Sequence, residues 1–104
     1  MGYKVSMTQE AENDLDEIVG YIAKTLLNPQ AAASLLEDFH DNLDILKTSP
    51  YGFAASSDSR LASEGYRKFI FKNNYISLYK IDESERIVSI RRIFYAKSNY
   101  ISLV

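Results

Sequence analysis

The spacing of apolar residues changes from helical to strand-like near residue 65, and this change constrains the fold more than any other feature. From residue 11 to residue 46 the apolar residues recur every three or four positions, which is the spacing of a helix with one buried face. From residue 66 they alternate with polar residues, which is the spacing of a strand with one buried face. A chain that forms helices first and strands afterwards is expected to fold as an α+β domain, with the helices packed on one face of an antiparallel sheet.

The first half of the sequence predicts a short strand over residues 3–7 followed by two helices. Thr8 offers a side-chain oxygen to begin the first helix, and the Asn28-Pro29 pair ends it. The same pair can begin the second helix, because Asn suits the N-cap and Pro lacks an N–H that the first helical position leaves unpaired anyway. We therefore expect an antiparallel helical hairpin. Its buried stripes are Ala11, Leu15, Ile18, Ile22 and Leu26, then Ala32, Leu35, Leu36, Phe39, Leu43 and Leu46.

The second half predicts a meander of three antiparallel strands over residues 66–72, 75–82 and 86–95, after a polar loop that reaches about residue 64. The expected order is β-α-α-β-β-β, in one domain over residues 1–104. Strand alternation divides the last strand into two faces, and the more apolar set belongs under the helices. That set is Val88, Ile90, Arg92 and Phe94, which leaves Arg91 and Tyr95 on the open face.

Composition excludes several classes of site. The chain has no Cys and a single His, so a disulfide framework and a conventional zinc site both lack their residues, and we expect no metal or cofactor. His40 lies among acidic residues on the second helix and is expected to be exposed. The sequence has no run of 18 apolar residues and no signal-peptide pattern, so we expect a cytoplasmic protein without membrane association.

Charge is divided unevenly along the chain. Residues 1–59 contain three basic and ten acidic side chains, whereas residues 60–97 contain nine basic and four acidic ones. The basic half could bind nucleic acid or an acidic protein. The alternative is that acidic helices and a basic sheet pair with each other, and charge alone does not choose between the two.

In this order and spacing, a set of short stretches resembles the RelE/ParE toxin superfamily over nearly the whole chain. None of the stretches is diagnostic alone. They are Tyr21-Ile22, Asn28-Pro29-Gln30-Ala31-Ala32, Leu46 with Ser49-Pro50, Gly65-Tyr66-Arg67, Asn74-Tyr75-Ile76 with Tyr79, and Arg92-Ile93-Phe94-Tyr95-Ala96-Lys97-Ser98-Asn99-Tyr100.

The resemblance implies the toxin of a type II toxin–antitoxin (plasmid-stabilisation) module, bound and neutralised by a cognate antitoxin in a hetero-oligomer. RelE-like members of the superfamily cleave mRNA on the ribosome, and ParE-like members poison DNA gyrase. Fold membership does not choose between these targets. The choice depends on individual residues.

RelE-like toxins carry out metal-independent RNA cleavage with basic and tyrosine side chains on the open sheet face. By this resemblance Arg67, Tyr95 and Lys97 match such positions, whereas Ile76 stands where a phosphate-binding arginine is usual. Arg91 could replace the missing charge from the neighbouring strand. If the chain is a nuclease, the catalytic residues are therefore expected to be Arg67, Arg91, Tyr95 and Lys97.

The substitution at position 76, Phe94 in place of a histidine, and the sequence pI of about 5.3 favour a ParE-like gyrase inhibitor. Two alternatives stay open: a RelE-like mRNA interferase, and a degenerate member that only binds a protein. For Arg91 and Arg92, the simpler interpretation is that they border the sheet and pair with Glu64 or Glu85.

Overall fold

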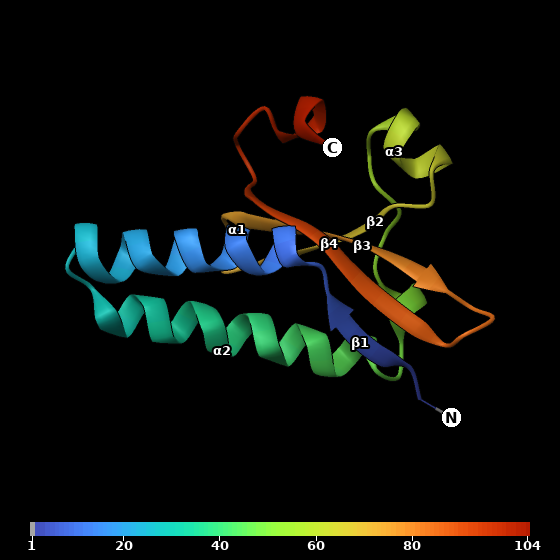
Figure 1. The fold of residues 1–104 in the computed structure, drawn as a ribbon, viewed down its shortest axis with the longest axis horizontal. Helices are drawn as coiled ribbons and strands as arrows, with labels where there is room; N and C mark the ends of the chain where they lie inside the picture. The colour runs from blue at the N-terminus through green and yellow to red at the C-terminus, as the bar shows by residue number, and fades with distance from the viewer. Residues whose placement is uncertain (1) are drawn as a thin grey trace.

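A computed structural model describes residues 2–104 and confirms the α+β architecture (Figure 1). The two long helices lie side by side as the expected hairpin and cover one face of the sheet. The strands are β1 (Lys4–Met7), β2 (Arg67–Phe71), β3 (Tyr75–Asp82) and β4 (Ile87–Tyr95). The helical elements are α1 (Gln9–Gly20), the π-helical turn η1 (Tyr21–Thr25), α2 (Pro29–Leu46), the short 3-10 turn η2 (Pro50–Gly52), α3 (Ser59–Ser63) and the 3-10 turn η3 (Tyr100–Leu103).

The sheet is mixed rather than wholly antiparallel. Its order is β1-β4-β3-β2, and the predicted meander of β2, β3 and β4 is confirmed. β1 pairs in parallel with β4, so the expectation of an antiparallel sheet is wrong for this strand. The helical hairpin returns the chain to the start of β1, where the Tyr3 N–H donates to the Lys47 carbonyl at 2.8 Å. The third strand of the meander that follows then runs in the direction of β1.

Both long helices begin as the sequence predicts. The Thr8 hydroxyl accepts the Ala11 N–H at 3.1 Å, and the Asn28 side chain accepts the Ala31 N–H at 3.1 Å, with Pro29 in the first turn. These caps satisfy N–H groups that have no partner inside the helix. Phe39 on α2 is fully buried, with its ring 5.1 Å from that of Phe71 and 5.9 Å from that of Phe69.

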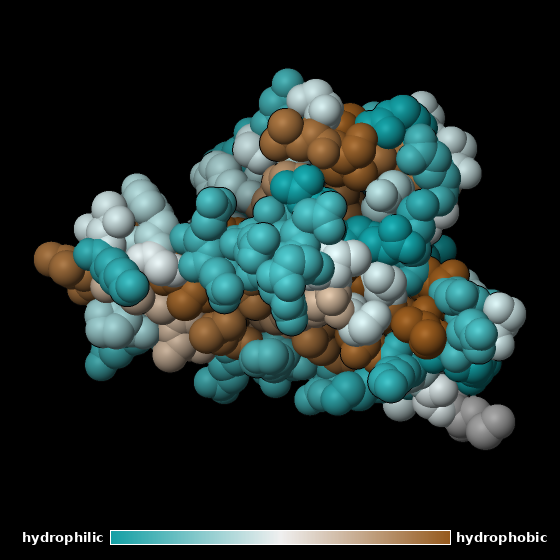
Figure 2. All heavy atoms as spheres, viewed as in Figure 1, coloured by the Kyte–Doolittle hydropathy of each residue, from teal (hydrophilic) through white to brown (hydrophobic). Residues whose placement is uncertain are grey.

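The end of the first helix differs from the expected α-helix. After Gly20 the chain forms a π-helical turn, in which the Leu26 N–H donates to the Tyr21 carbonyl five residues earlier, at 3.0 Å. Leu27 follows with φ 52°, a left-handed conformation that glycine or asparagine usually supplies at a helix end. The tip of the helical hairpin is also apolar and exposed, because Leu26 and Leu27 are 55% and 81% exposed there. Figure 2 shows apolar atoms at this tip and hydrophilic atoms along the outward side of α1.

A bulge in β4 reverses which side chains face the helices. Tyr79 pairs with Ile90 and Leu78 with Arg92, so Arg91 has no partner on β3. An extra residue in one strand shifts the alternation of side chains beyond it. Val88 and Ile90 lie under the helices as predicted. The prediction is wrong beyond the bulge, because Arg92 and Phe94 are on the open face and Ile93 and Tyr95 are on the helix side.

The open face is partly covered by α3 and η3, which lie near each other although far apart in sequence (Figure 1). The polar loop of the prediction contains α3, which begins at Asp58, whose carboxylate accepts the Leu61 N–H at 2.9 Å. The ring of Tyr100 from η3 stacks on that of Phe94 at 5.5 Å. The buried members of this second cluster are Leu61, Ile76, Leu78, Phe94 and Tyr100. No helix within residues 2–104 is long and apolar enough to span a membrane.

Candidate functional site

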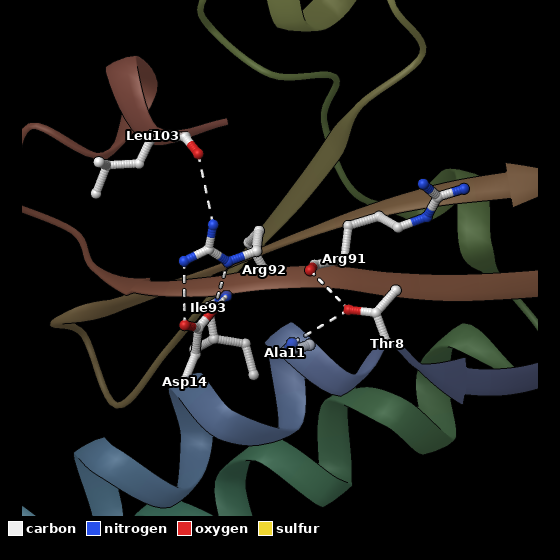
Figure 3. Close-up of polar contacts among 7 residues, drawn as sticks. All are labelled: Thr8, Ala11, Asp14, Arg91, Arg92, Ile93 and Leu103. Atoms are coloured by element: carbon white, nitrogen blue, oxygen red, sulfur yellow. Dashed lines mark hydrogen bonds and ion pairs between the residues drawn. The ribbon is translucent and has the colours of Figure 1, made fainter.

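Arg92 is held by Asp14 of α1 rather than by Glu64 or Glu85. Its Nε and Nη2 atoms donate to the two carboxylate oxygens at 2.8 and 3.2 Å (Figure 3). Asp14 Oδ2 also accepts the Ile93 N–H at 2.9 Å, and this carboxylate raises the pKa of Arg92 above its ordinary value. Asp14 therefore ties α1 to the edge of β4 beyond the end of β1. Glu64 pairs instead with Arg60.

Arg91 lies next to Arg92 but points away from it along β4 (Figure 3). Its Nε atom donates to the Ser89 hydroxyl at 3.1 Å, and it has no ion pair with any residue from 2 to 104. Lys80 shares a cleft of about 480 Å³ with it on the open face, and Asp82 also lines this cleft. The prediction that Arg91 faces outward is confirmed. The Arg91 guanidinium is therefore a positive charge on the open face that no ion pair with a described residue neutralises.

Arg67 has a different position, on the helix side of the sheet at the start of β2. Its guanidinium donates to the carbonyls of Tyr51 and Phe53 and lies 5.4 Å from the centre of the Tyr51 ring. The neighbouring Tyr79 hydroxyl donates to the Pro50 carbonyl at 2.7 Å, and burial raises the pKa of this phenol. Arg67 thus fixes the loop around η2 to the sheet.

Tyr95 is also on the helix side, at the opposite end of the sheet from Arg67. Arg67 pairs with Tyr79 and Tyr95 pairs with Tyr75, a separation of roughly 13 Å along β3 at about 3.3 Å per residue. Lys97 follows β4 and is exposed. The structure therefore does not bring the four candidate residues together, because Arg91 is on the open face while Arg67 and Tyr95 are on the other.

The position of the missing arginine is part of the apolar cover of the open face. Ile76 is 2% exposed and belongs to the cluster with Leu78 and Phe94. A guanidinium at this position would be buried among apolar groups without a partner, which is costly. Ile76 is therefore consistent with the packing of α3 and η3 on this face.

Sequence reasoning missed a cleft on the helix side. The cleft has a volume of about 520 Å³ and is lined by Glu17, Ile18, Tyr21, Tyr75 and Tyr95. Burial, followed by the neighbouring Tyr95 and Tyr21, raises the pKa of Tyr75. One signal was available in the sequence, since Glu17 and Tyr21 are four residues apart and so share one helix face. No group of three or more acidic or His side chains within residues 2–104 is arranged to hold a metal ion.

Several solved structures have a fold similar to that of this chain. The chromosomal ParDE system from P. aeruginosa superposes with a TM-score of 0.70 at 17% identity, covering 91% of this chain and 97% of that chain. The RelBE2 toxin–antitoxin complex from Mycobacterium tuberculosis gives 0.60 at 20% identity, covering 94% and 95%. The archaeal RelE–RelB complex from Pyrococcus horikoshii gives 0.57 at 14% identity, covering 94% and 100%. The superpositions establish a RelE/ParE-like fold, and at identities this low they establish the fold alone.

The family follows from the sequence itself. Residues 5–100 match the model of the ParE toxin of type II toxin–antitoxin system, parDE, and the chain belongs to this family. It is accordingly the toxin component of a type II toxin–antitoxin module. No curated protein matches the chain in sequence.

Proposed function

We propose that this toxin inhibits growth by acting on DNA gyrase rather than by cutting ribosome-bound mRNA. The observation that carries the proposal is the division of the candidate nuclease residues between two faces of the sheet. Metal-independent RNA cleavage needs a general base, positive charge and a proton donor within hydrogen-bond reach of one phosphate. Arg67 and Tyr95 lie on the helix side and Arg91 on the open side, so one phosphate does not reach all three.

Two arginines in this region are already engaged by other groups of the protein. Arg92 is neutralised by Asp14, with side-chain exposures of 27% and 15%, and Arg67 is bonded to main-chain carbonyls. The outward sides of α1 and α2 carry many acidic residues, which oppose the approach of RNA. A protein target, met by a surface with apolar and acidic regions, fits this distribution better. Both candidate targets imply a cytoplasmic site of action.

The second candidate is a ribosome-dependent mRNA endonuclease, and one observation favours it. Arg91 has no ion pair with any described residue and shares a cleft with Lys80, so two cations that could bind a phosphate lie together on the open face, in a cleft that Asp82 and Glu83 also line. In that case Arg67, Arg91, Tyr95 and Lys97 remain the residues expected to carry the reaction. An Arg67→Ala, Arg91→Ala double variant would then lose cleavage.

The test is expression of the chain without its antitoxin from a tightly controlled promoter, with DNA, RNA and protein synthesis followed by short radiolabel pulses. We expect DNA synthesis to stop first, and growth to return when the antitoxin is co-expressed. Arg91→Ala and Lys97→Ala, both substitutions of outward-facing cations, should leave toxicity unchanged. An early stop of protein synthesis with cut mRNA would contradict the proposal, and unimpaired growth would favour the binding-only alternative.

A further inference from the structure

The tyrosine cleft on the helix side is assembled from four elements. Glu17 and Ile18 come from α1, Tyr21 from η1, Tyr75 from the start of β3, and Tyr95 from the end of β4. The Tyr75 and Tyr95 rings meet edge to face at 5.9 Å. Tyr21 and Tyr95 are 56% and 45% exposed, so ring surface faces the opening. The result is an aromatic cleft that is accessible from solvent.

The backbone beside this cleft has an unusual conformation. The π-helical turn begins at Tyr21 itself and ends at Thr25, and Leu27, two residues further on, has a left-handed φ of 52°. π-helical turns are rare and occur often at functional sites, because they change the direction of the side chains that follow. A left-handed leucine is also unfavourable. A rare backbone conformation therefore begins at the residue that supplies a ring to the cleft.

The charge of the cleft favours a cation. The exposed Glu17 carboxylate lies at its margin and has neither an ion pair nor a side-chain hydrogen bond with any residue from 2 to 104. The faces of aromatic rings carry negative electrostatic potential and attract cations. None of the lining residues is basic. Three tyrosine rings and one unpaired carboxylate thus present negative potential on an already acidic helix.

We propose that this cleft binds the side chain of an arginine from a partner protein. The planar guanidinium stacks on aromatic rings and can donate two parallel hydrogen bonds to a carboxylate, so it can use the tyrosine rings and Glu17 together. A lysine could pair with Glu17 but could not stack a planar group on the rings. An aliphatic or aromatic side chain would leave the Glu17 carboxylate without a partner. The site is independent of whether the toxin acts on gyrase or on the ribosome.

The direct test is a titration of the intact protein, labelled with ¹³C in its tyrosine rings, followed by NMR at constant ionic strength. The probe is the capped peptide acetyl-Gly-Arg-Gly-amide, and the control is the same peptide with citrulline, which has the shape of arginine without its charge. We expect saturable shifts of the Tyr21, Tyr75 and Tyr95 rings with the arginine peptide, at an affinity on the order of millimolar. The citrulline peptide should bind at least about fivefold more weakly.

Two substitutions separate the charge from the rings. Glu17→Gln and Tyr21→Leu should each weaken arginine binding roughly two- to fivefold, since each removes one of the interactions with the guanidinium. Glu12→Gln, an exposed substitution on α1 that does not line the cleft, should leave binding unchanged. Thermal unfolding of each variant verifies that it is folded. Equal binding of the citrulline peptide, unchanged affinity of Glu17→Gln, or no saturation at tens of millimolar would overturn the proposal.

Discussion

On the helix side of the sheet, thirteen buried residues of α1, η1, α2, β2, β3 and β4 form one continuous apolar cluster, whereas the open side has a separate cluster of five. The helix side is closed by large rings, with Phe39 between α2 and β2. The open side is closed by α3 and η3, which are held by this smaller apolar cluster and by polar bonds. Arg60 donates to the main-chain oxygens of Ile101 and Val104 at 2.9 and 3.1 Å, and Arg92 to that of Leu103 at 3.4 Å.

This difference indicates that the two faces have unequal roles. Burial of apolar surface stabilises the helix side in proportion to its area, so its loss unfolds the protein. The cover of the open side has fewer buried groups and solvent-exposed hydrogen bonds, which are the features of a segment that opens locally before global unfolding. We therefore expect the helix side to provide most of the stability, and the cover of the open side to open locally before the protein unfolds.

The largest expected effect is on the helix side. Phe39→Ala should lower the free energy of unfolding by about 3–5 kcal/mol, because it leaves a cavity between α2 and the sheet. Urea denaturation measures this change. Glu37→Ala, an exposed neighbour on the same helix, should change stability by less than about 0.5 kcal/mol. A loss below about 1 kcal/mol in Phe39→Ala would show that this face is not the main source of stability.

Asp14 joins the two faces, so its removal should have an intermediate effect. Asp14→Ala leaves the Arg92 guanidinium and the Ile93 N–H without their acceptor, and the expected loss is about 1–3 kcal/mol. Chemical denaturation provides the value, and the exposed Asp16→Ala is the matched control. Equal stability of the two variants would contradict the role of Asp14 as the link between α1 and β4.

A smaller and more local effect is expected at Arg60. Arg60→Gln should lower global stability by less than about 1 kcal/mol, since the arginine and its salt-bridge partner Glu64 are both about half exposed. Amide hydrogen exchange in η3 should nevertheless become faster, while exchange in α2 and β3 is unchanged. Lys47→Gln, which removes an exposed pair with Asp44 and touches neither cluster, is the control. Unchanged exchange in η3 would show that Arg60 does not hold this segment.

The smallest effect concerns two tyrosines, one on each side of the sheet. Burial raises the pKa of Tyr75 on the helix side and of Tyr100 on the open side. Because each folded pKa is above the unfolded value near 10, the contribution to stability is complete below about pH 10. It is lost as pH rises through the folded pKa. In Arg60→Gln, NMR titration of the tyrosine rings should show the pKa of Tyr100 moving back toward 10, while that of Tyr75 stays. Equal shifts in the pKa values of Tyr75 and Tyr100 would show that Arg60 does not act on the open face alone.

Local patterns in the sequence predict most of the fold. The Thr8 and Asn28 caps, the helical hairpin and the boundaries of β3 all follow from interactions within a few residues. The parallel pairing of β1 with β4 does not follow from local patterns, because it depends on the path of the whole chain. His40 is exposed as expected.

The candidate site was less predictable, and one residue accounts for much of the difference. Strand alternation assumes a regular ladder, and the bulge at Arg91 breaks it, so every side chain from Arg92 to Tyr95 changes face. A bulge has no signal in a single strand, since it depends on pairing with β3. The contact between Asp14 and Arg92, 78 residues apart, is equally hidden from local patterns.

We propose that this ParE-family toxin acts on DNA gyrase, and the observation behind the proposal is that its candidate nuclease residues lie on two faces of the sheet. The most direct measurement adds the purified toxin to two reconstituted reactions, DNA supercoiling by gyrase and translation of a defined mRNA on ribosomes. We predict inhibited supercoiling and intact mRNA, with both reactions normal when the antitoxin is added first. Cut mRNA on ribosomes, together with unaffected supercoiling, would contradict the account.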